Sequence, residues 1–479
     1  MQVAQHKAKY DSMFLVAWII MAFYLMLRAY FVDITDDEAW SYFNVKHFWW
    51  VETLCSGNTH WFNFLAIKAA LLLGLEKAWH LRWFSLLSGI TFLCIGYLWL
   101  KSLDQLIIKL FAFALIFLNP YVIEYLTLAR GYSSALCFMA LSLYFYFTSD
   151  KKIIIPLSLL FAGCSAIANF NFFYFFVPFA TIYFYKYYFQ YRFICFKNKQ
   201  FYIDGLYAIS TVFLVLRALA FIKECSNDIG SFGGEDLVTS VFGSFIDTLI
   251  YGQFSISSLL KNVLGYGLLG LVLLACVYGL ASFKRHTNNL YYYSSLILLG
   301  MLFLVVFNNW VFHVLYPTER TALMFYPLMV IVIVLFFNYI SIKTMLKNCM
   351  LYLGSVLLMI NFSVNAKLVS GYDHAYCMNT NQYFEYLGSL KAKKVCLAVE
   401  VYFVYLKYYH YTNSPFYAES INEYKTNPKY IFNHHLKDFE YLLILPPYNL
   451  TYYKEKDIAL KPVKYFQDTK ALIVKVEKK

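Results

Sequence analysis

The chain has 479 residues, of which 61% are hydrophobic and only 14% are charged. A soluble globular protein is closer to half apolar and a quarter charged, so this composition excludes a soluble protein of this size. It also excludes a disordered chain, which would be poor in hydrophobic residues. The net charge of +12 comes from short Lys and Arg clusters between apolar segments. That distribution is typical of cytoplasmic membrane loops and not of a nucleic-acid-binding surface.

Apolar runs separated by polar residues follow one another from the N-terminus to about residue 365. The first run, from Met13 to Val32, is about 20 residues long, which is enough to cross a bilayer. No small-residue cleavage site follows it, so we expect an uncleaved first helix and not a signal peptide. The sequence predicts about 11 transmembrane helices, at 13–32, 82–100, 105–118, 132–148, 153–168, 172–185, 201–222, 262–282, 291–307, 321–340 and 349–365.

The basic clusters predict how these helices are oriented. If the N-terminus is inside and the short apolar run 61–75 does not cross, every Lys and Arg cluster between spans lies on the cytoplasmic side. We therefore expect 61–75 to be a juxtamembrane helix at the outer face. Ten of the 17 acidic residues before position 366 then fall in two outer loops, where they could contribute to a site that faces outward.

After residue 365 the sequence becomes more polar and contains no further span. Short β-rich runs at Val395–Val399, Tyr441–Leu445 and Ala471–Val476 predict strands, and Val401–His410 suits a helix. The sequence thus predicts a transmembrane domain of residues 1–365 and a small α/β domain of residues 366–479. An odd number of spans places the second domain on the extracytoplasmic side.

An acidic cluster follows the first span directly. Asp33, Asp36, Asp37 and Glu38 lie within six residues of one another. Mutual repulsion and partial burial raise the pKa of a carboxyl group, which suits a general base or a cation site. A solvated acidic loop is the alternative explanation, and the aromatic residues that flank the cluster weaken it.

Three further segments lie at predicted outer edges of the spans. His60 begins the juxtamembrane helix, where it could bind phosphate, assist proton transfer or simply anchor the helix. Asn119-Pro120 breaks a helix and is followed by Glu124 and Arg130. Arg130 and Arg320 each begin a span, and a guanidinium suits bidentate phosphate binding. The alternative for both arginines is a side chain that snorkels to the interface.

The order of these segments resembles the GT-C glycosyltransferases of the bacterial protein-mannosyltransferase-like group (family 39 and its relatives). The similarity covers roughly residues 10–340. It rests on the acidic pair Asp37-Glu38, the His60 helix, the segment Glu76–Gly89, the segment Ala129-Arg-Gly-Tyr132 and the segment Pro317–Arg320. Relatives often have Pro after the histidine, whereas Trp61 follows it here.

The resemblance implies a polytopic α-helical GT-C fold and an inverting transfer of a sugar from a polyprenyl-phosphate donor to an extracytoplasmic acceptor. Asp37 would be the base that deprotonates the acceptor hydroxyl, and Glu38 would position the acceptor or the sugar. Arg130, Arg320 and His60 would bind the donor phosphate, where negative charge develops as it leaves. Further candidates for substrate contact are Asp36, Glu124, Tyr132 and Asp247.

The same resemblance implies a multi-pass protein of the bacterial cytoplasmic (inner) membrane. Its partners would be the lipid-linked donor, membrane lipids and a glycan, lipid or protein acceptor. Several relatives need no divalent cation, although the extra acidic residues leave room for one. A transporter or lipid flippase is the main alternative, but transporters place ionisable residues at mid-membrane depth and contain inverted repeats, which are not evident in this sequence. A third alternative is a non-catalytic membrane scaffold.

Overall fold

The computed structural model describes most of the helical part of the chain and the strands near its C-terminus. The described residues are 2–47, 60–148, 155–191, 205–206, 208–216, 220, 233–250, 257–281, 289–341, 343–369, 380–392, 395–397, 439–444, 458–467 and 471–478. The chain forms two compact units. The first comprises residues 1–27, 51–65 and 83–366, and the second comprises residues 28–50, 66–82 and 367–479.

Helices build the first unit, and two of them, α1 (Gln2–Phe31) and α4 (Trp61–Leu72), continue into the second. The other helical segments of the first unit are α6 (Trp83–Ser102), α7 (Leu106–Phe117), α8 (Pro120–Thr127), α9 (Gly131–Thr148), α10 (Ile155–Ala168), η1 (Phe170–Phe172), α11 (Phe173–Tyr191), η2 (Val238–Gly243), α13 (Ser244–Ile250), α14 (Ser258–Ala281), α15 (Asn289–Phe312), η4 (Glu319–Phe325), α16 (Tyr326–Tyr339) and α17 (Thr344–Asn365).

Several of these helices match the dimensions of a bilayer. Among the described residues six are long and apolar enough to cross a membrane, or seven if the bent pair α7–α8 is one span. They are Tyr10–Phe31, Trp83–Ser102, Ser258–Ala281, Leu290–Phe312, Glu319–Tyr339 and Thr344–Asn365. The polytopic helical fold predicted from the sequence is confirmed. The predicted span 201–222 lies largely outside the described residues, although 208–216 are helical.

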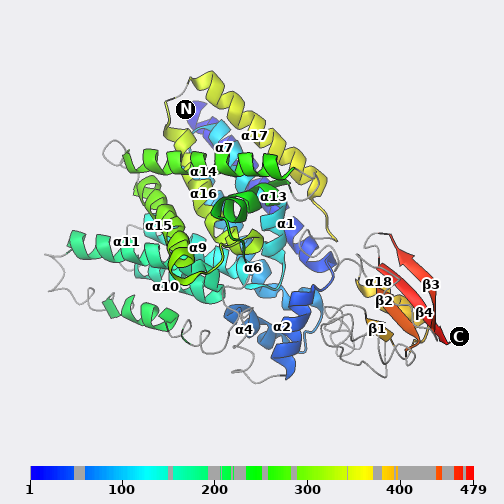
Figure 1. Ribbon diagram of the computed structural model, residues 1–479. Coiled ribbons are helices and arrows are strands. Elements are labelled where there is room, and N and C mark those ends of the chain that lie inside the picture. Colours follow the sequence, from blue (N-terminus) through cyan, green and yellow to red (C-terminus); the bar gives the residue numbers. More distant parts are fainter. Residues whose placement is uncertain are drawn as a thin grey trace. The chain divides into compact units, whose positions relative to one another are not determined.

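Close helix contacts organise the interior of the first unit. Helix α9 packs against α6 and α10, and α14 packs against α15 and α16 (Figure 1). Small residues permit this approach: a Cβ on Gly89 would lie 2.9 Å from the carbonyl oxygen of Leu126. Ser133 donates a 2.6 Å hydrogen bond to the carbonyl of Ser85 on α6. Small side chains let helix backbones approach in membrane bundles, and here they hold the start of α9 against α6.

The predicted break at Asn119-Pro120 is confirmed. The Asn119 side chain accepts hydrogen bonds from the backbone N–H groups of Tyr121 and Val122, at 3.0 and 3.2 Å. These bonds satisfy donors that the first turn of α8 leaves without intrahelical partners, and Pro120 suits the first helical position. Helices α7 and α8 are bent by 49°. The bend brings the chain to the junction of α8 and α9, where Arg130 lies.

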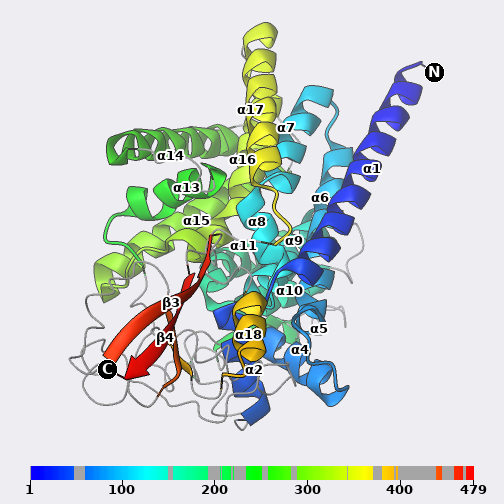
Figure 2. The same cartoon turned by 90° about the vertical axis from the view of Figure 1, so that its right-hand side faces the viewer.

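The second unit contains a four-stranded mixed sheet with the strand order β1-β2-β4-β3. Strand β1 (Val395–Leu397) runs parallel to β2 (Tyr441–Ile444), and β4 (Ala471–Lys478) pairs antiparallel with both β2 and the edge strand β3 (Ile458–Phe466). Helix α18 (Thr380–Ser389) packs on the sheet, with the rings of Tyr383 and Phe466 4.6 Å apart (Figure 2). The unit also contains α2 (Asp36–His47) and α5 (Ala78–Leu81).

The sequence predicted three of these four strands. Strand β3 was not predicted because Lys461, Pro462 and Lys464 interrupt its apolar pattern, as is common in edge strands. The proposed helix Val401–His410 lies outside the described residues. The division into domains at residues 365 and 366 stays a prediction, since the structure groups residues 28–50 and 66–82 with the C-terminal residues.

Candidate functional site

Three residues of the acidic cluster, Asp36, Asp37 and Glu38, form the first turn of helix α2 in the second unit. Thr35 precedes the helix, and its backbone N–H donates to Glu38 Oε2 at 2.9 Å. The Glu38 backbone N–H in turn donates to Thr35 Oγ1 at 3.3 Å. These reciprocal bonds form a capping box, in which each side chain satisfies a backbone donor of the other residue. The carboxylates beside it also lie at the positive end of the helix dipole, which stabilises them.

Arg82 holds this turn in place. Its Nε and Nη2 atoms donate to Glu38 Oε1 and Oε2 at 2.7 and 2.6 Å. Nη1 donates to the carbonyls of Ala29 and Val32, and Nη2 also donates to that of Asp33. All five guanidinium donors are therefore used, and three of them satisfy carbonyls at or just beyond the end of α1. Arg82 and Glu38 are 0% and 1% exposed, so the ion pair is fully buried.

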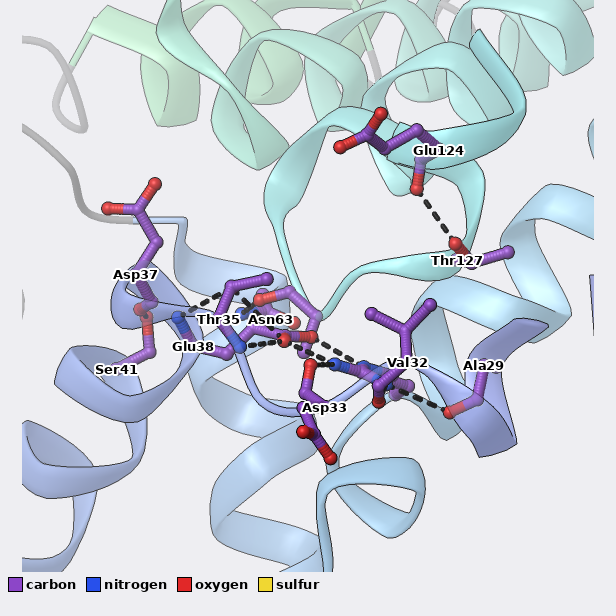
Figure 3. Close-up of polar contacts among 12 residues, drawn as sticks. Ala29, Val32, Asp33, Thr35, Asp37, Glu38, Ser41, Asn63, Glu124 and Thr127 are labelled. Atoms are coloured by element: carbon purple, nitrogen blue, oxygen red, sulfur yellow. Dashed lines mark hydrogen bonds and ion pairs between the residues drawn. The ribbon is translucent and has the colours of Figure 1, made fainter. Parts of the chain in front are cut away.

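Asp37 has a different environment from Glu38. Figure 3 shows that the Asp37 carboxylate points away from the Glu38 side chain, and the residue is partly exposed. The backbone carbonyl of Asp37 accepts a 2.8 Å hydrogen bond from Ser41 within the same helix. Asp36, the first residue of α2, is also partly exposed. Of the pair Asp37-Glu38, Glu38 is therefore buried and hydrogen-bonded, whereas Asp37 is partly exposed on the same helical turn.

A second polar cluster lies in the first unit, around His60 at the start of α4. His60 is 6% exposed, and its Nδ1 lies 3.3 Å from the carbonyl oxygen of Ala168. A carbonyl can only accept, so Nδ1 carries the proton and Nε2 presents a lone pair. Burial lowers the pKa of His60 well below its usual 6.5, the positive charges of Arg130 and Arg320 lower it further, and the Ala168 bond partly opposes them. The imidazole is therefore neutral.

Asn63, one turn further along α4, binds the segment that carries Arg130. Its Nδ2 donates a 2.5 Å hydrogen bond to the carbonyl of Ala129. Gly131 makes room for the histidine, because a Cβ there would lie 2.5 Å from His60 Nδ1 and 2.2 Å from the carbonyl oxygen of Ala168. The lack of a side chain at Gly131 thus permits the close contact between the start of α4, the start of α9 and the end of α10.

Arg130 itself is buried at the junction of α8 and α9. It is 1% exposed, and its carbonyl accepts a 3.3 Å hydrogen bond from Ser85. Tyr132 follows it, with its ring 5.5 Å from that of His60. Glu124 is also buried, and its backbone carbonyl accepts a 2.8 Å hydrogen bond from Thr127 (Figure 3). A guanidinium fixed in such surroundings is suited to bind an anion.

Arg320 lies in the 3-10 segment η4 and is partly exposed. The residue before it, Glu319, has a left-handed φ of 46° and donates its backbone N–H to Ser244 Oγ at 2.8 Å. Strained backbone of this kind clusters at functional sites because the surrounding contacts must enforce it. Asp247 forms an ion pair with Lys261 and is partly exposed.

The structure brings together part of the predicted site. The cluster in the first unit contains His60, Arg130 and Tyr132, and Arg320 lies within electrostatic reach of His60. Asp36, Asp37 and Glu38 belong to the second unit. The structural roles of Arg82, Thr35 and Asn63 were not predicted from the sequence. Only the capping box had a recognisable signal, the pattern Thr-x-x-Glu at residues 35–38.

Metal ligation gives no additional site. Within the residues that the structure describes, no three His, Cys, Asp or Glu side chains form a group that could hold a metal ion. The candidate residues described above offer carboxylates, an imidazole and guanidinium groups.

The helices and their apolar surfaces define a polytopic α-helical membrane protein. The chain is similar in structure to ArnT from Cupriavidus metallidurans, whose crystal structure was determined in the apo state. The match covers 97% of this chain and 98% of that chain, with 10% sequence identity and a TM-score of 0.43. No protein-family model and no curated protein sequence matches the chain.

Proposed function

We propose that the protein is a membrane glycosyltransferase that transfers a sugar from a polyprenyl-phosphate donor to a hydroxyl group of an acceptor. The observation that carries this proposal is Arg130, a buried residue whose positive charge acts on the neighbouring neutral His60 in a protein of apolar helices. A guanidinium group in such a position suits binding of the phosphate of a lipid donor. The order of motifs that resembles GT-C glycosyltransferases supports the same class of reaction.

In the proposed reaction Asp37 accepts the proton of the acceptor hydroxyl. The acceptor oxygen attacks the anomeric carbon of the sugar from the side opposite the phosphate. The bond between that carbon and the phosphate oxygen breaks, and polyprenyl phosphate leaves with the electron pair. Arg130 and Arg320 stabilise the charge that develops on the phosphate. The product has the inverted configuration, and the proton resides on Asp37.

Glu38 has a positioning role in this proposal. Its carboxylate is occupied by Arg82 and by the capping box, so it fixes the turn from which Asp37 projects. Asp36, Glu124, Tyr132 and Asp247 remain candidates for substrate contact. We place the reaction at the outer face of a bacterial inner membrane, with the C-terminal residues on the same side, as the basic clusters predict.

Release of polyprenyl phosphate by the purified protein tests the proposal. A labelled undecaprenyl-phosphate sugar is incubated with the wild type and with Asp37→Asn, and the released lipid is measured. Loss of a general base lowers turnover by roughly 10²–10⁴-fold. Asp33→Asn is the matched control, because it removes a partly exposed carboxylate close to the same helical turn and keeps the Asp33 carbonyl that Arg82 contacts. Equal turnover in D37N and the wild type would contradict the assigned base.

An assay in reconstituted vesicles distinguishes a transporter from a glycosyltransferase. A transporter would move the labelled lipid across the membrane of reconstituted vesicles without releasing polyprenyl phosphate. Separately, labelling of an engineered cysteine near residue 420 from outside the cell would support the predicted orientation. Labelling only from inside would contradict it.

A further inference from the structure

The cluster around His60 contains a buried hydrogen-bond acceptor that the proposed chemistry does not use. The proton on His60 Nδ1 is directed at the carbonyl of Ala168, which fixes the tautomer. Nε2 therefore presents its lone pair, and among the described residues it has no hydrogen-bond partner. A buried polar atom in this state requires an explanation, because such atoms are normally paired with protein, water or ligand.

Asn63 contributes a second acceptor of the same kind. Its Nδ2 must face the carbonyl of Ala129, because that carbonyl can only accept, and the orientation of the amide is thereby fixed. Oδ1 is buried, and the described part of the chain supplies no partner for it. The residue is 1% exposed. His60 and Asn63 are three residues apart at the start of α4, where such residues lie on one face of a helix.

These two acceptors lie beside cationic groups. Asn63 is bonded to the residue before Arg130, and the charges of Arg130 and Arg320 act on His60. The two positive charges would attract an anion, but the two lone pairs would repel it. The complementary ligand therefore carries both a negative charge and hydroxyl donors. A phosphodiester that links a sugar to a lipid has no P–OH donor at neutral pH, so the donors must be sugar hydroxyl groups.

We propose that His60 Nε2 and Asn63 Oδ1 accept hydrogen bonds from hydroxyl groups of the donor sugar, and that they select sugar-bearing over sugar-free lipid. This assignment rests on the proposed glycosyltransferase function and gives His60 a role other than binding the phosphate. Polar sites of this type discriminate strongly, because a ligand without the hydroxyl leaves their buried acceptors unpaired.

Binding of sugar-free and sugar-bearing lipids distinguishes a role of His60 in binding the sugar from a role in binding the phosphate. The full-length protein in detergent is titrated with undecaprenyl phosphate and with undecaprenyl phosphate that carries glucose, mannose or galactose. His60→Asn retains a donor for the Ala168 carbonyl but removes the acceptor at Nε2, whereas His60→Gln can present an oxygen near the Nε2 position. Asn63→Ala removes the second acceptor. Asn309→Ala is the matched control, because Asn309 also donates to a backbone carbonyl, that of Val314.

We expect the wild type to bind at least one sugar-bearing lipid about tenfold or more tightly than undecaprenyl phosphate. H60N and N63A should lose most of this preference while their Kd for undecaprenyl phosphate stays unchanged. H60Q should retain part of the preference, and N309A should retain all of it. The assignment would be wrong if H60N bound undecaprenyl phosphate and the sugar-bearing lipids more weakly by the same factor. It would also be wrong if the wild type preferred none of the three sugar-bearing lipids over undecaprenyl phosphate. If the wild type bound neither lipid, the proposed function itself would be wrong.

Discussion

Arg82 and Glu38 form a buried, bidentate ion pair, with Nε–Oε1 and Nη2–Oε2 distances of 2.7 and 2.6 Å. The remaining donors of Arg82 satisfy carbonyls of residues 29–33, so one side chain connects the end of α1 to the start of α2. A planar guanidinium can make this set of contacts, whereas a lysine ammonium cannot. The turn that carries Asp37 is therefore held by a residue 45 positions away in the sequence.

Arg82→Met should destabilise the protein strongly. It leaves the Glu38 carboxylate buried without its cation, and such a change costs about 3–5 kcal/mol. Arg82→Lys should have an intermediate melting temperature, because it keeps the positive charge but not the planar pair of donors that binds both oxygens of Glu38. The melting temperature in detergent measures both effects. A melting temperature of R82M equal to that of the wild type would show that the pair does not support the fold.

The matched control is the exposed pair Lys475–Glu477, whose side chains are 49% and 41% exposed. Lys475→Met should change the free energy of unfolding by less than about 1 kcal/mol, because water screens an exposed ion pair.

Gly131→Ala should disturb the cluster around His60. The added Cβ would lie 2.2 Å from a backbone oxygen and 2.5 Å from His60 Nδ1, and the backbone oxygen cannot move away cheaply. We expect a lower melting temperature and weaker binding of undecaprenyl-phosphate sugars. Gly270→Ala is the control, because its Cβ would meet nothing within 4 Å. In the interior of a helix that substitution is neutral or stabilises by up to about 1 kcal/mol. If the melting temperature and lipid binding fell equally in G131A and G270A, the close packing around Gly131 would not explain the effect.

Most of the helical fold could be predicted from the sequence, because the apolar runs are long and the breaks between them carry their own signals. Asn119 and Pro120 show this directly: an amide that caps a helix and a proline at its first position determine where α8 begins. Strand β3 could not be predicted in the same way, since Pro462 and its neighbouring lysines are tolerated because β3 is an edge strand whose pairing with β4 is irregular between Pro462 and Lys464. Its pairing with β4 depends on tertiary contacts that its own sequence does not encode.

The candidate site could be predicted only in part. Charge and position make Arg130 and Asp37 candidates, because an Arg or a carboxylate next to a long apolar run stands out in an apolar sequence. The capping box between Thr35 and Glu38 had a sequence signal, but the partner of Glu38 did not. Arg82 lies 44 positions after Glu38, at the C-cap of α5, so their contact depends on the tertiary fold. The tautomer of His60 likewise follows from the position of one carbonyl on α10, which no local pattern specifies.

Asn119→Ala should destabilise the junction between α7 and α8. The substitution removes the acceptor of two backbone donors, and loss of an N-cap side chain costs about 0.5–2 kcal/mol. Asn119→Ser should retain most of the stability, because a serine hydroxyl also caps a helix and adds no charge at this buried position. Differential scanning fluorimetry of both variants in detergent checks the order wild type, N119S, N119A. A variant N119A that melts above N119S would contradict the capping role.

The stability of the protein should decrease in mild acid because of His60. Its pKa in the folded protein is well below 6.5, first through burial and then through the charge of Arg130, whereas in the unfolded chain it returns to about 6.5. Below pH 6.5 the unfolded state therefore binds a proton that the folded state does not, and each further pH unit costs up to about 1.4 kcal/mol until the folded pKa is reached. Between pH 7.5 and 5.5 the melting temperature of the wild type should fall more steeply than that of His60→Gln. Both proteins share every other titrating group, so parallel curves would show that His60 is not held neutral by the fold.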